Sequence, residues 1–270
     1  MTHTAPAIRI RFGLTPLERT RPWGREQPVL HWFGLTAGWY CIDLGGHEVL
    51  RYSERTLREL RAEGSDRPDH PYVDYYVVRL WEDLIALVSE AMEPVPADLA
   101  DLAADTSPAL AWRDTPEADT ALTWYSAGSL YTDYLRVAPH IRCRRTVSDG
   151  HDTVTVAWEH RADPEGVIEF TGPQSGRIIL PTDEFLAAVT ELDRALMAAM
   201  DERIGQLTLS GAPPGVRLDI EGLRQEHRSR AARLQQALDR DPGTDWETVR
   251  MGVRLLLTPR TAEEEADDDE

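Results

Sequence analysis

The chain has 270 residues, 41% of them hydrophobic, which is enough to bury a core of domain size. Its formal charge is -18, and all 29 basic residues are arginine, as the codon usage of a high-GC bacterial genome would produce. An excess of negative charge this large argues against nonspecific binding to nucleic acid and against adhesion to anionic membranes.

Two cysteines, Cys41 and Cys143, are too few for a disulfide framework, so we expect both thiols to be reduced. The N-terminus lacks the charged and apolar regions of a secretory signal. No apolar run reaches the length of about 18 residues that a membrane helix needs. The sequence therefore predicts a soluble cytoplasmic protein.

The first predicted elements are a strand and a short helical turn. From Ile8 to Leu14, apolar residues alternate with Arg9, Arg11 and Gly13, which is the pattern of a half-buried strand. A capping box at residues 15–18 then predicts one turn of helix.

The segment 29–52 predicts a β-hairpin that turns at the glycines of residues 45–46. A two-residue loop would place Asp43 opposite Glu48, and like charges in that position are destabilising. A three-residue loop that includes His47 avoids this pair, so we favour a hairpin with a glycine bulge.

The favoured register assigns the residues of this hairpin to two faces. Tyr40 lies opposite Tyr52 on the apolar face. Trp39 and Asp43 lie on the other face together with Arg51, and the sequence predicts Asp43 and Arg51 to be diagonal partners.

Helical spacing of apolar residues predicts two long helices, at 72–92 and 182–205. A short helix capped by Ser53 precedes them, Asp219 caps a later helix, and a last helix covers about 245–257. The buried stripes of the two long helices are expected to be Val73, Val77, Leu80, Leu84, Leu87 and Ala91 in the first, and Phe185, Val189, Leu192, Leu196, Met200 and Ile204 in the second.

Two further hairpins are predicted, one at 141–160 around Asp149-Gly150 and one at 167–180. Residues 93–121 are rich in Pro, Ala and Asp. They predict a short helix near 96–104 and then a surface loop, and they are the candidate for an internal boundary.

These elements together predict an α+β fold in which antiparallel hairpins are covered by long amphipathic helices. We expect a single domain over residues 1–260. The order of sheet followed by long helix occurs twice, which is the pattern of a weak pseudo-repeat, although the two halves share no residue-level identity. Residues 261–270 carry seven acids and are expected to form a disordered tail.

Three segments resemble an uncharacterised family of actinobacterial proteins known only as a domain of unknown function. They are RPWG at 21–24, LHWFGLTAGWYCIDLGG at 30–46 and YYVVRLWEDL at 75–84. The resemblance covers most of the chain and is strongest up to about residue 90. It implies that the aromatic block is a defining element of the fold, and it implies no activity or functional residue.

No motif for a metal, a cofactor or a nucleophile occurs in the sequence. It lacks Cys-x-x-Cys, histidines paired at helical spacing, the GxSxG elbow and the glycine patterns of phosphate loops. Cys143 lies on one predicted hairpin with His151 and His160, but the Asp149-Gly150 turn places it near Val156 and away from both. We therefore expect no metal and no cofactor.

One strand face has the composition of a binding surface. It carries Trp39, Asp43 and Arg51, with His31 nearby, and aromatic and arginine side chains are enriched in interaction hot spots. His31 and Asp43 could also carry out acid-base chemistry. The alternative structural interpretation is that a long helix covers this face.

The arginines offer a second candidate site. Alternation places Arg142 and Arg144 on one face of a strand beside His140, where they could bind an anion or pair within the chain. Four further arginines are expected to line a solvated face of the late helix: Arg224, Arg228, Arg230 and Arg233.

Two classes of function fit these features. The first is a noncatalytic module that binds a protein partner and neutralises a toxin, as an immunity protein does. The alternative is an enzyme of unrecognised class that uses His31 and Asp43 in a cleft. The neighbouring genes discriminate between them, because a secreted toxin would favour the first and a metabolic operon the second. The partner and the oligomeric state do not follow from the sequence.

Overall fold

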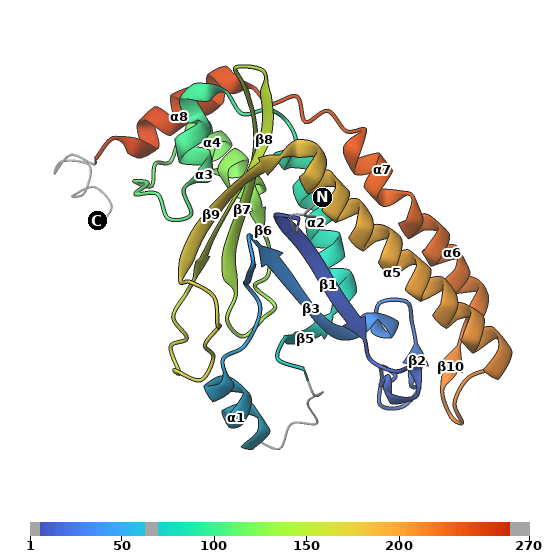
Figure 1. The fold of residues 1–270 in the computed structure, drawn as a ribbon. Helices are drawn as coiled ribbons and strands as arrows, with labels where there is room; N and C mark the ends of the chain where they lie inside the picture. The colour runs from blue at the N-terminus through green and yellow to red at the C-terminus, as the bar shows by residue number, and fades with distance from the viewer. Residues whose placement is uncertain (1–5, 63–69, 260–270) are drawn as a thin grey trace, which may run out of the picture.

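A computed structural model describes residues 6–62 and 70–259 of the chain and has an α+β fold, as predicted (Figure 1). Two antiparallel sheets are each followed in the sequence by a long helix. The N-terminal sheet contains β1 (Ile8–Leu14), β3 (Ala37–Leu44), β4 (His47–Glu48) and β5 (Val73–Tyr76), and the C-terminal sheet contains β6 (Ser129–Leu130), β7 (Pro139–Ser148), β8 (His151–His160) and β9 (Ser175–Pro181).

Helices pack against these sheets, and a short parallel pair joins β2 (Val29–Leu30) to β10 (Arg217–Leu218). In Figure 1, α5 and α6 run side by side along one flank of the molecule. The α-helices are α1 (Glu54–Ala62), α2 (Val77–Ala91), α3 (Ala100–Ala104), α4 (Pro116–Ala127), α5 (Thr182–Ser210), α6 (Ile220–Ala231), α7 (Arg233–Leu238) and α8 (Trp246–Leu257), and the 3-10 turns are η1 (Leu17–Arg19), η2 (Gly34–Thr36) and η3 (Ala97–Leu99).

The N-terminal hairpin adopts the register that the charge argument rejected. Gly45 and Gly46 have φ angles of 61° and 85° and form a two-residue loop, so Asp43 lies opposite Glu48. Both glycines occupy the left-handed region that this tight turn requires. The predicted three-residue loop was therefore wrong.

The strand that follows this turn is also shorter than predicted. Pairing with β3 ends at Glu48, so Tyr40 does not face Tyr52. Tyr52 instead forms an isolated bridge with Phe170, and their rings stack with centroids 5.4 Å apart.

Part of the first predicted long helix is a strand. Residues 73–76 form β5, which pairs with β3 through partners such as Trp39 and Asp74, and α2 begins at Val77. The β-branched and aromatic residues of this segment suit a pleated strand, and tertiary pairing outweighs the helical spacing of Val73. All residues of the predicted stripe are nevertheless buried.

The C-terminal sheet confirms one predicted hairpin and corrects the other. The turn at Asp149-Gly150 joins β7 to β8 and places Cys143 opposite Val156, as expected. The hairpin predicted at 167–180 is wrong, because β9 pairs with β8 and residues 167–170 belong to no named strand.

Most helix boundaries follow the predicted capping residues. Ser53 Oγ accepts from the Thr56 amide at 3.2 Å, and Asp219 and Asp245 cap α6 and α8. The turn after Thr15 is a 3-10 turn without a side-chain cap. The predicted stripe of α5 is buried, and this helix continues to residue 210.

The segment predicted as a surface loop before residue 121 contains the start of α4. Thr115 caps this helix and Pro116 occupies its first turn. Helix α4 packs against α8 in a second hydrophobic cluster, separate from the main one: Val95, Leu99, Ala103, Ala118, Ala121, Trp124, Val249, Val253 and Leu256. The acidic tail at 261–270 lies outside the described residues.

Candidate functional site

The N-terminal sheet presents its two faces to different surroundings. Tyr40, Ile42 and Leu44 of β3 belong to the main hydrophobic cluster together with residues of α2 and α5. In Figure 1, α2 lies behind β1 and β3, and no described helix crosses in front of them. We call that opposite side the outer face. It consists of Tyr72, Arg51 and the following strand residues: Arg9, Arg11, Gly13, Trp39, Cys41, Asp43, Glu48, Asp74 and Tyr76.

Trp39 is the centre of a stacked layer on the outer face. Its indole lies over Gly13 of the neighbouring strand. Tyr72 stacks on Trp39 with ring centroids 4.8 Å apart, and the Arg11 guanidinium lies 5.2 Å from the centroid of the Tyr72 ring. Stacked aromatic and guanidinium groups restrict one another's rotamers, so this layer is ordered by contacts within the chain.

Glu48 joins the charged groups of this layer. Its carboxylate binds the guanidinium of Arg11, accepts from Arg51 Nη1 at 2.6 Å and accepts from the Tyr72 hydroxyl at 3.0 Å. Burial alone would raise the pKa of Glu48, but these hydrogen bonds outweigh it and hold the pKa below its ordinary value. The predicted diagonal pair of Asp43 and Arg51 was wrong, since Arg51 binds Glu48.

Asp43 and Cys41 lie on the same face, and both are held by contacts within the fold. Asp43 Oδ1 accepts from the Gly46 amide at 2.9 Å and so stabilises the hairpin turn. Cys41 is completely buried under the charged layer, and burial raises the pKa of its thiol to about 12. A thiol in this state is a poor nucleophile.

His31 belongs to an aromatic cluster beyond the other end of β3. Its ring lies 4.6 Å from Trp23 and 6.3 Å from Phe33, and Trp23 Nε1 donates to the Tyr76 hydroxyl at 3.0 Å. His31 Nδ1 accepts from the Gly34 amide, and burial lowers the pKa of the imidazole. Trp23 remains 45% exposed.

The structure does not bring His31 and Asp43 together. His31 precedes the start of β3, whereas Asp43 is its penultimate residue. Asp43 lies six residue steps along the strand from Ala37, which corresponds to roughly 20 Å. General acid-base chemistry needs donor and acceptor within hydrogen-bond reach, and this pair is not arranged in that way.

Arg142 and Arg144 lie on one face of β7, as alternation predicts, but both are buried. Their guanidiniums donate to main-chain oxygens at the end of α4: both bind the carbonyl of Tyr125, and Arg144 also binds that of Trp124. These carbonyls form the negative end of the helix dipole, which favours cations there. Neither guanidinium faces bulk solvent.

Arg230 departs from the solvated face predicted for the late helix. It is buried and lies 4.4 Å from the centroid of the Trp32 ring. Its guanidinium pairs with Glu82 of α2 at 2.7 Å and with Glu226 at 2.9 Å. The sequence did not indicate that Arg230 pairs with Glu82, because the two residues are 148 positions apart.

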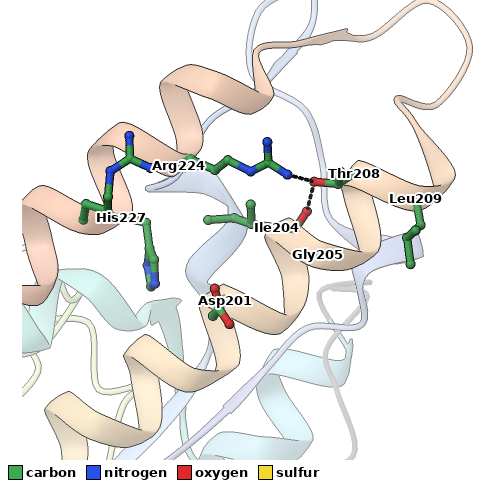
Figure 2. A pocket seen from close by; sticks show the side chains of 8 residues that line it. Asp201, Ile204, Gly205, Thr208, Leu209, Arg224 and His227 are labelled. Carbon is green, nitrogen blue, oxygen red and sulfur yellow. Dashed lines mark hydrogen bonds between the residues drawn. The ribbon is translucent and has the colours of Figure 1, made fainter.

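An open pocket of about 560 Å³ lies between α5 and α6 (Figure 2). Figure 2 shows Arg224 reaching across to Thr208, and its Nη2 donates to Thr208 Oγ1 at 3.3 Å. Arg224 also pairs with Glu221 at 2.7 Å, so part of its charge is neutralised. Leu209 at the rim is almost fully exposed.

The described residues give no sign of a metal centre or a membrane span. Among residues 6–62 and 70–259, no three side chains of His, Cys, Asp or Glu are grouped to hold a metal ion. None of the helices in these ranges combines the length and hydropathy that crossing a bilayer requires.

Residues 9–252 match the model of a family of unknown function, DUF5984. The chain belongs to this family. The match runs from the second residue of β1 into α8 and therefore includes the whole outer face. No curated protein and no solved structure matches the chain. Membership of DUF5984 confirms that this is an uncharacterised family, and it assigns no activity.

Proposed function

We propose that this protein is a noncatalytic module that binds another protein through the outer face of its N-terminal sheet. The observation that carries the proposal is the position of the two long helices, which pack on the opposite side of this sheet. Among the described residues, the outer face holds aromatic and charged side chains without a covering helix.

The composition of the outer face supports a protein partner. Tryptophan, tyrosine and arginine are the residues most enriched in hot spots, and Trp39, Tyr72 and Arg11 form one stacked layer here. Since stacking already restricts these side chains, less conformational entropy is lost when a partner binds. The neighbouring cluster adds Trp23, which is partly exposed.

The charge of the chain supports a basic partner. A formal charge of -18 attracts a cationic protein at long range and accelerates its association. Neutralisation of a basic toxin is the specific role that fits this charge and the binding face. We place the protein in the cytoplasm, which its two free thiols, Cys41 and Cys143, support.

The proposal is tested by measuring binding between the full chain and the purified products of the neighbouring genes. We expect one product to bind, and Arg51→Ala and Trp23→Ala to weaken it by about tenfold or more. Arg51 is 41% exposed, so losing its surface ion pair should hardly change the melting temperature. Arg177→Ala on β9 is the control, because it removes an exposed arginine from the other sheet.

The Asp43→Asn variant tests the negative charge of Asp43 separately from its hydrogen bond in the hairpin turn. The amide oxygen retains the hydrogen bond from the Gly46 amide, so the hairpin should remain folded. Weaker binding by this variant would assign the Asp43 charge to the interface. Equal binding by Arg51→Ala, Trp23→Ala and the Arg177→Ala control would place the interface elsewhere and reject the proposal.

A further inference from the structure

A smaller pocket of about 240 Å³ lies beside the C-terminal sheet, where β6 meets β7. Its lining includes the hydroxyl groups of Ser126 and Ser129, the imidazole of His140 and the guanidinium of Arg161. We call it the His140 pocket. Typical pockets for drug-sized ligands begin at about 300 Å³, so this one suits a small molecule or a single charged group.

The wall of the His140 pocket is connected to a buried cation. Ser129 Oγ accepts from Arg142 Nη1 at 2.7 Å and lies 3.4 Å from His140 Nε2. Arg142 is almost completely buried, with its guanidinium 3.4 Å from the centroid of the Tyr125 ring, and Tyr125 also lines the pocket. The Ser129 hydroxyl therefore links the positive charge of Arg142 to the cavity.

This buried charge has no acidic partner within the described residues. No carboxylate of residues 6–62 and 70–259 forms an ion pair with Arg142 or Arg144, which bind neutral oxygens instead. Arg230 shows the usual arrangement, because it pairs with two glutamates. Buried cations are ordinarily paired, whereas here the α4 carbonyls and the charges of Asp105 and Glu90, which form no ion pair with Arg142 or Arg144, offset the positive charge behind the pocket only in part.

We propose that the His140 pocket binds a small oxyanion, a carboxylate or phosphate group, which Arg161 contacts directly at the exposed rim and which Ser129 and His140 contact inside. Arg142 stabilises the bound anion through Ser129. The inference does not depend on the proposed protein-binding function, since the pocket lies on the other sheet.

The charges around His140 are consistent with a positive potential in the cavity. Burial lowers the pKa of His140, and Arg142 and Arg161 lower it further, while a hydrogen bond with the Thr106 backbone and the charge of Glu159 oppose this. Glu159, the cross-strand partner of His140 on β8, accepts from Ser107 and Thr106 through Oε2, and these hydrogen bonds lower its pKa, so its negative charge offsets part of the positive potential. Asp133 is the acid in the lining, and it is exposed at the rim, where solvent screens it.

An anion in the pocket must therefore raise the pKa of His140. The imidazolium, which the two arginines disfavour, gains a favourable partner when an oxyanion binds beside it. Binding and protonation are linked, so the anion binds more tightly as the pH falls through the pKa of His140.

The experiment follows the His140 ring by NMR in the full chain with labelled histidine, using His140→Gln to assign its signal. Sodium phosphate or sodium acetate is added at constant ionic strength against sodium chloride. We expect saturable shifts of the His140 signal and a higher pKa. Arg161→Gln and Ser129→Ala should weaken the response by about tenfold or more, because each removes a hydrogen bond to a charged group.

Arg177→Gln on β9 is the matched control, since it changes the net charge equally and should leave the response intact. A response to phosphate alone assigns a phosphate ligand, a response to acetate alone assigns a carboxylate, and a response to both assigns the shared charge. An unchanged pKa with both salts overturns the proposal. An equal response in Arg161→Gln and Arg177→Gln also overturns it, and both substitutions are at exposed positions that should not impair folding.

Discussion

The indole of Trp39 lies across Gly13, where an added Cβ atom would come within 2.5 Å of the indole nitrogen. The absence of a side chain at Gly13 is therefore what allows Trp39 to lie flat on the sheet and stack with Tyr72. The outer face depends on this glycine for its shape as well as on the residues that it displays.

Gly13→Ala is expected to displace the indole and to lower the free energy of unfolding by about 1–3 kcal/mol, the usual cost of overpacking. The measurement is urea unfolding of the single variants and of the double variant with Trp39→Ala. In the Trp39→Ala background the same substitution should be nearly neutral, because the overlapping group is gone. An equal cost in both backgrounds would show that Trp39 is not the cause.

Glu48→Gln tests the charged layer beside Trp39. We expect a loss of about 1–3 kcal/mol at pH 7, because the carboxylate accepts hydrogen bonds from Arg11, Arg51 and Tyr72. The pKa of Glu48 is lower in the folded protein, so its contribution is present above the unfolded pKa and is lost as the pH falls through the folded pKa.

The difference between wild type and Glu48→Gln should therefore shrink below about pH 4. Glu59→Gln is the control, since Glu59 forms an exposed pair with Arg55 one helical turn away. Its loss should stay below about 0.5 kcal/mol at every pH. A pH-independent cost at Glu48 would contradict the role given to its charge.

A third prediction concerns the close contact of α4 and α8. A Cβ atom at Gly252 would overlap the backbone carbonyl of Glu117, and backbone cannot move aside as a flexible side chain can. Gly252→Ala should cost about 2 kcal/mol or more in thermal or urea unfolding. Gly205→Ala in α5 is the control, because nothing lies within 4 Å of that position.

The control should stabilise the protein by about 1 kcal/mol, since alanine is the better helix former. Opposite signs at Gly252 and Gly205 are the expected result. A neutral or stabilising effect at Gly252 would mean that α8 does not pack against α4 as closely as described.

The sequence was sufficient to predict the faces of the N-terminal sheet but not their contacts. Alternation correctly separates Tyr40 from Trp39 and Asp43. The register was mispredicted because the argument considered only the pair Asp43 and Glu48. Glu48 pairs with Arg51 three positions later, but also with Arg11, 37 positions before it, and accepts a hydrogen bond from Tyr72, 24 positions after it, and no local rule includes the last two contacts.

The missed elements have related causes. Segment 73–76 fits a helical stripe and a strand equally well, and only pairing with β3 decides between them. Helix α4 carries a cap at Thr115 and Pro116, a signal that was present in the sequence and was hidden by the Pro-, Ala- and Asp-rich composition around it. The His140 pocket combines β6, β7 and Arg161, so it follows only from the tertiary structure.

The final prediction concerns Asp83 of α2, which contacts Tyr134 and Arg79 in a half-buried network. Tyr40 donates to the Tyr134 hydroxyl at 3.4 Å, and Arg79 Nη2 lies 3.6 Å from Asp83 Oδ1. Among the described residues, Asp83 Oδ2 has no hydrogen-bond partner. Burial raises the pKa of Asp83 from 3.8 to about 6, although Arg79 and Tyr134 partly oppose this.

A carboxyl group whose pKa is raised in the folded protein contributes stability that is fully present below its pKa in the unfolded chain. This contribution is lost as the pH rises through its pKa in the folded protein. The ionised carboxylate should therefore destabilise the fold above about pH 6 by roughly 1–2 kcal/mol, less than the full pKa difference would give, because solvent partly screens the pair with Arg79. Asp83→Asn is neutral at every pH and similar in shape, so it should be more stable than wild type at pH 8 and about equal at pH 4.

Urea unfolding of both proteins between pH 4 and pH 8 provides the measurement. Asp98→Asn is the control, because the pKa of Asp98 is shifted in the opposite direction. A hydrogen bond from Arg250 lowers the pKa of this exposed carboxylate, so removing its charge should not stabilise the protein at pH 8. If Asp83→Asn were less stable than wild type at pH 8, the ion pair with Arg79 would outweigh the desolvation of Asp83. The carboxylate would then be a stabilising partner of Arg79 in the fold.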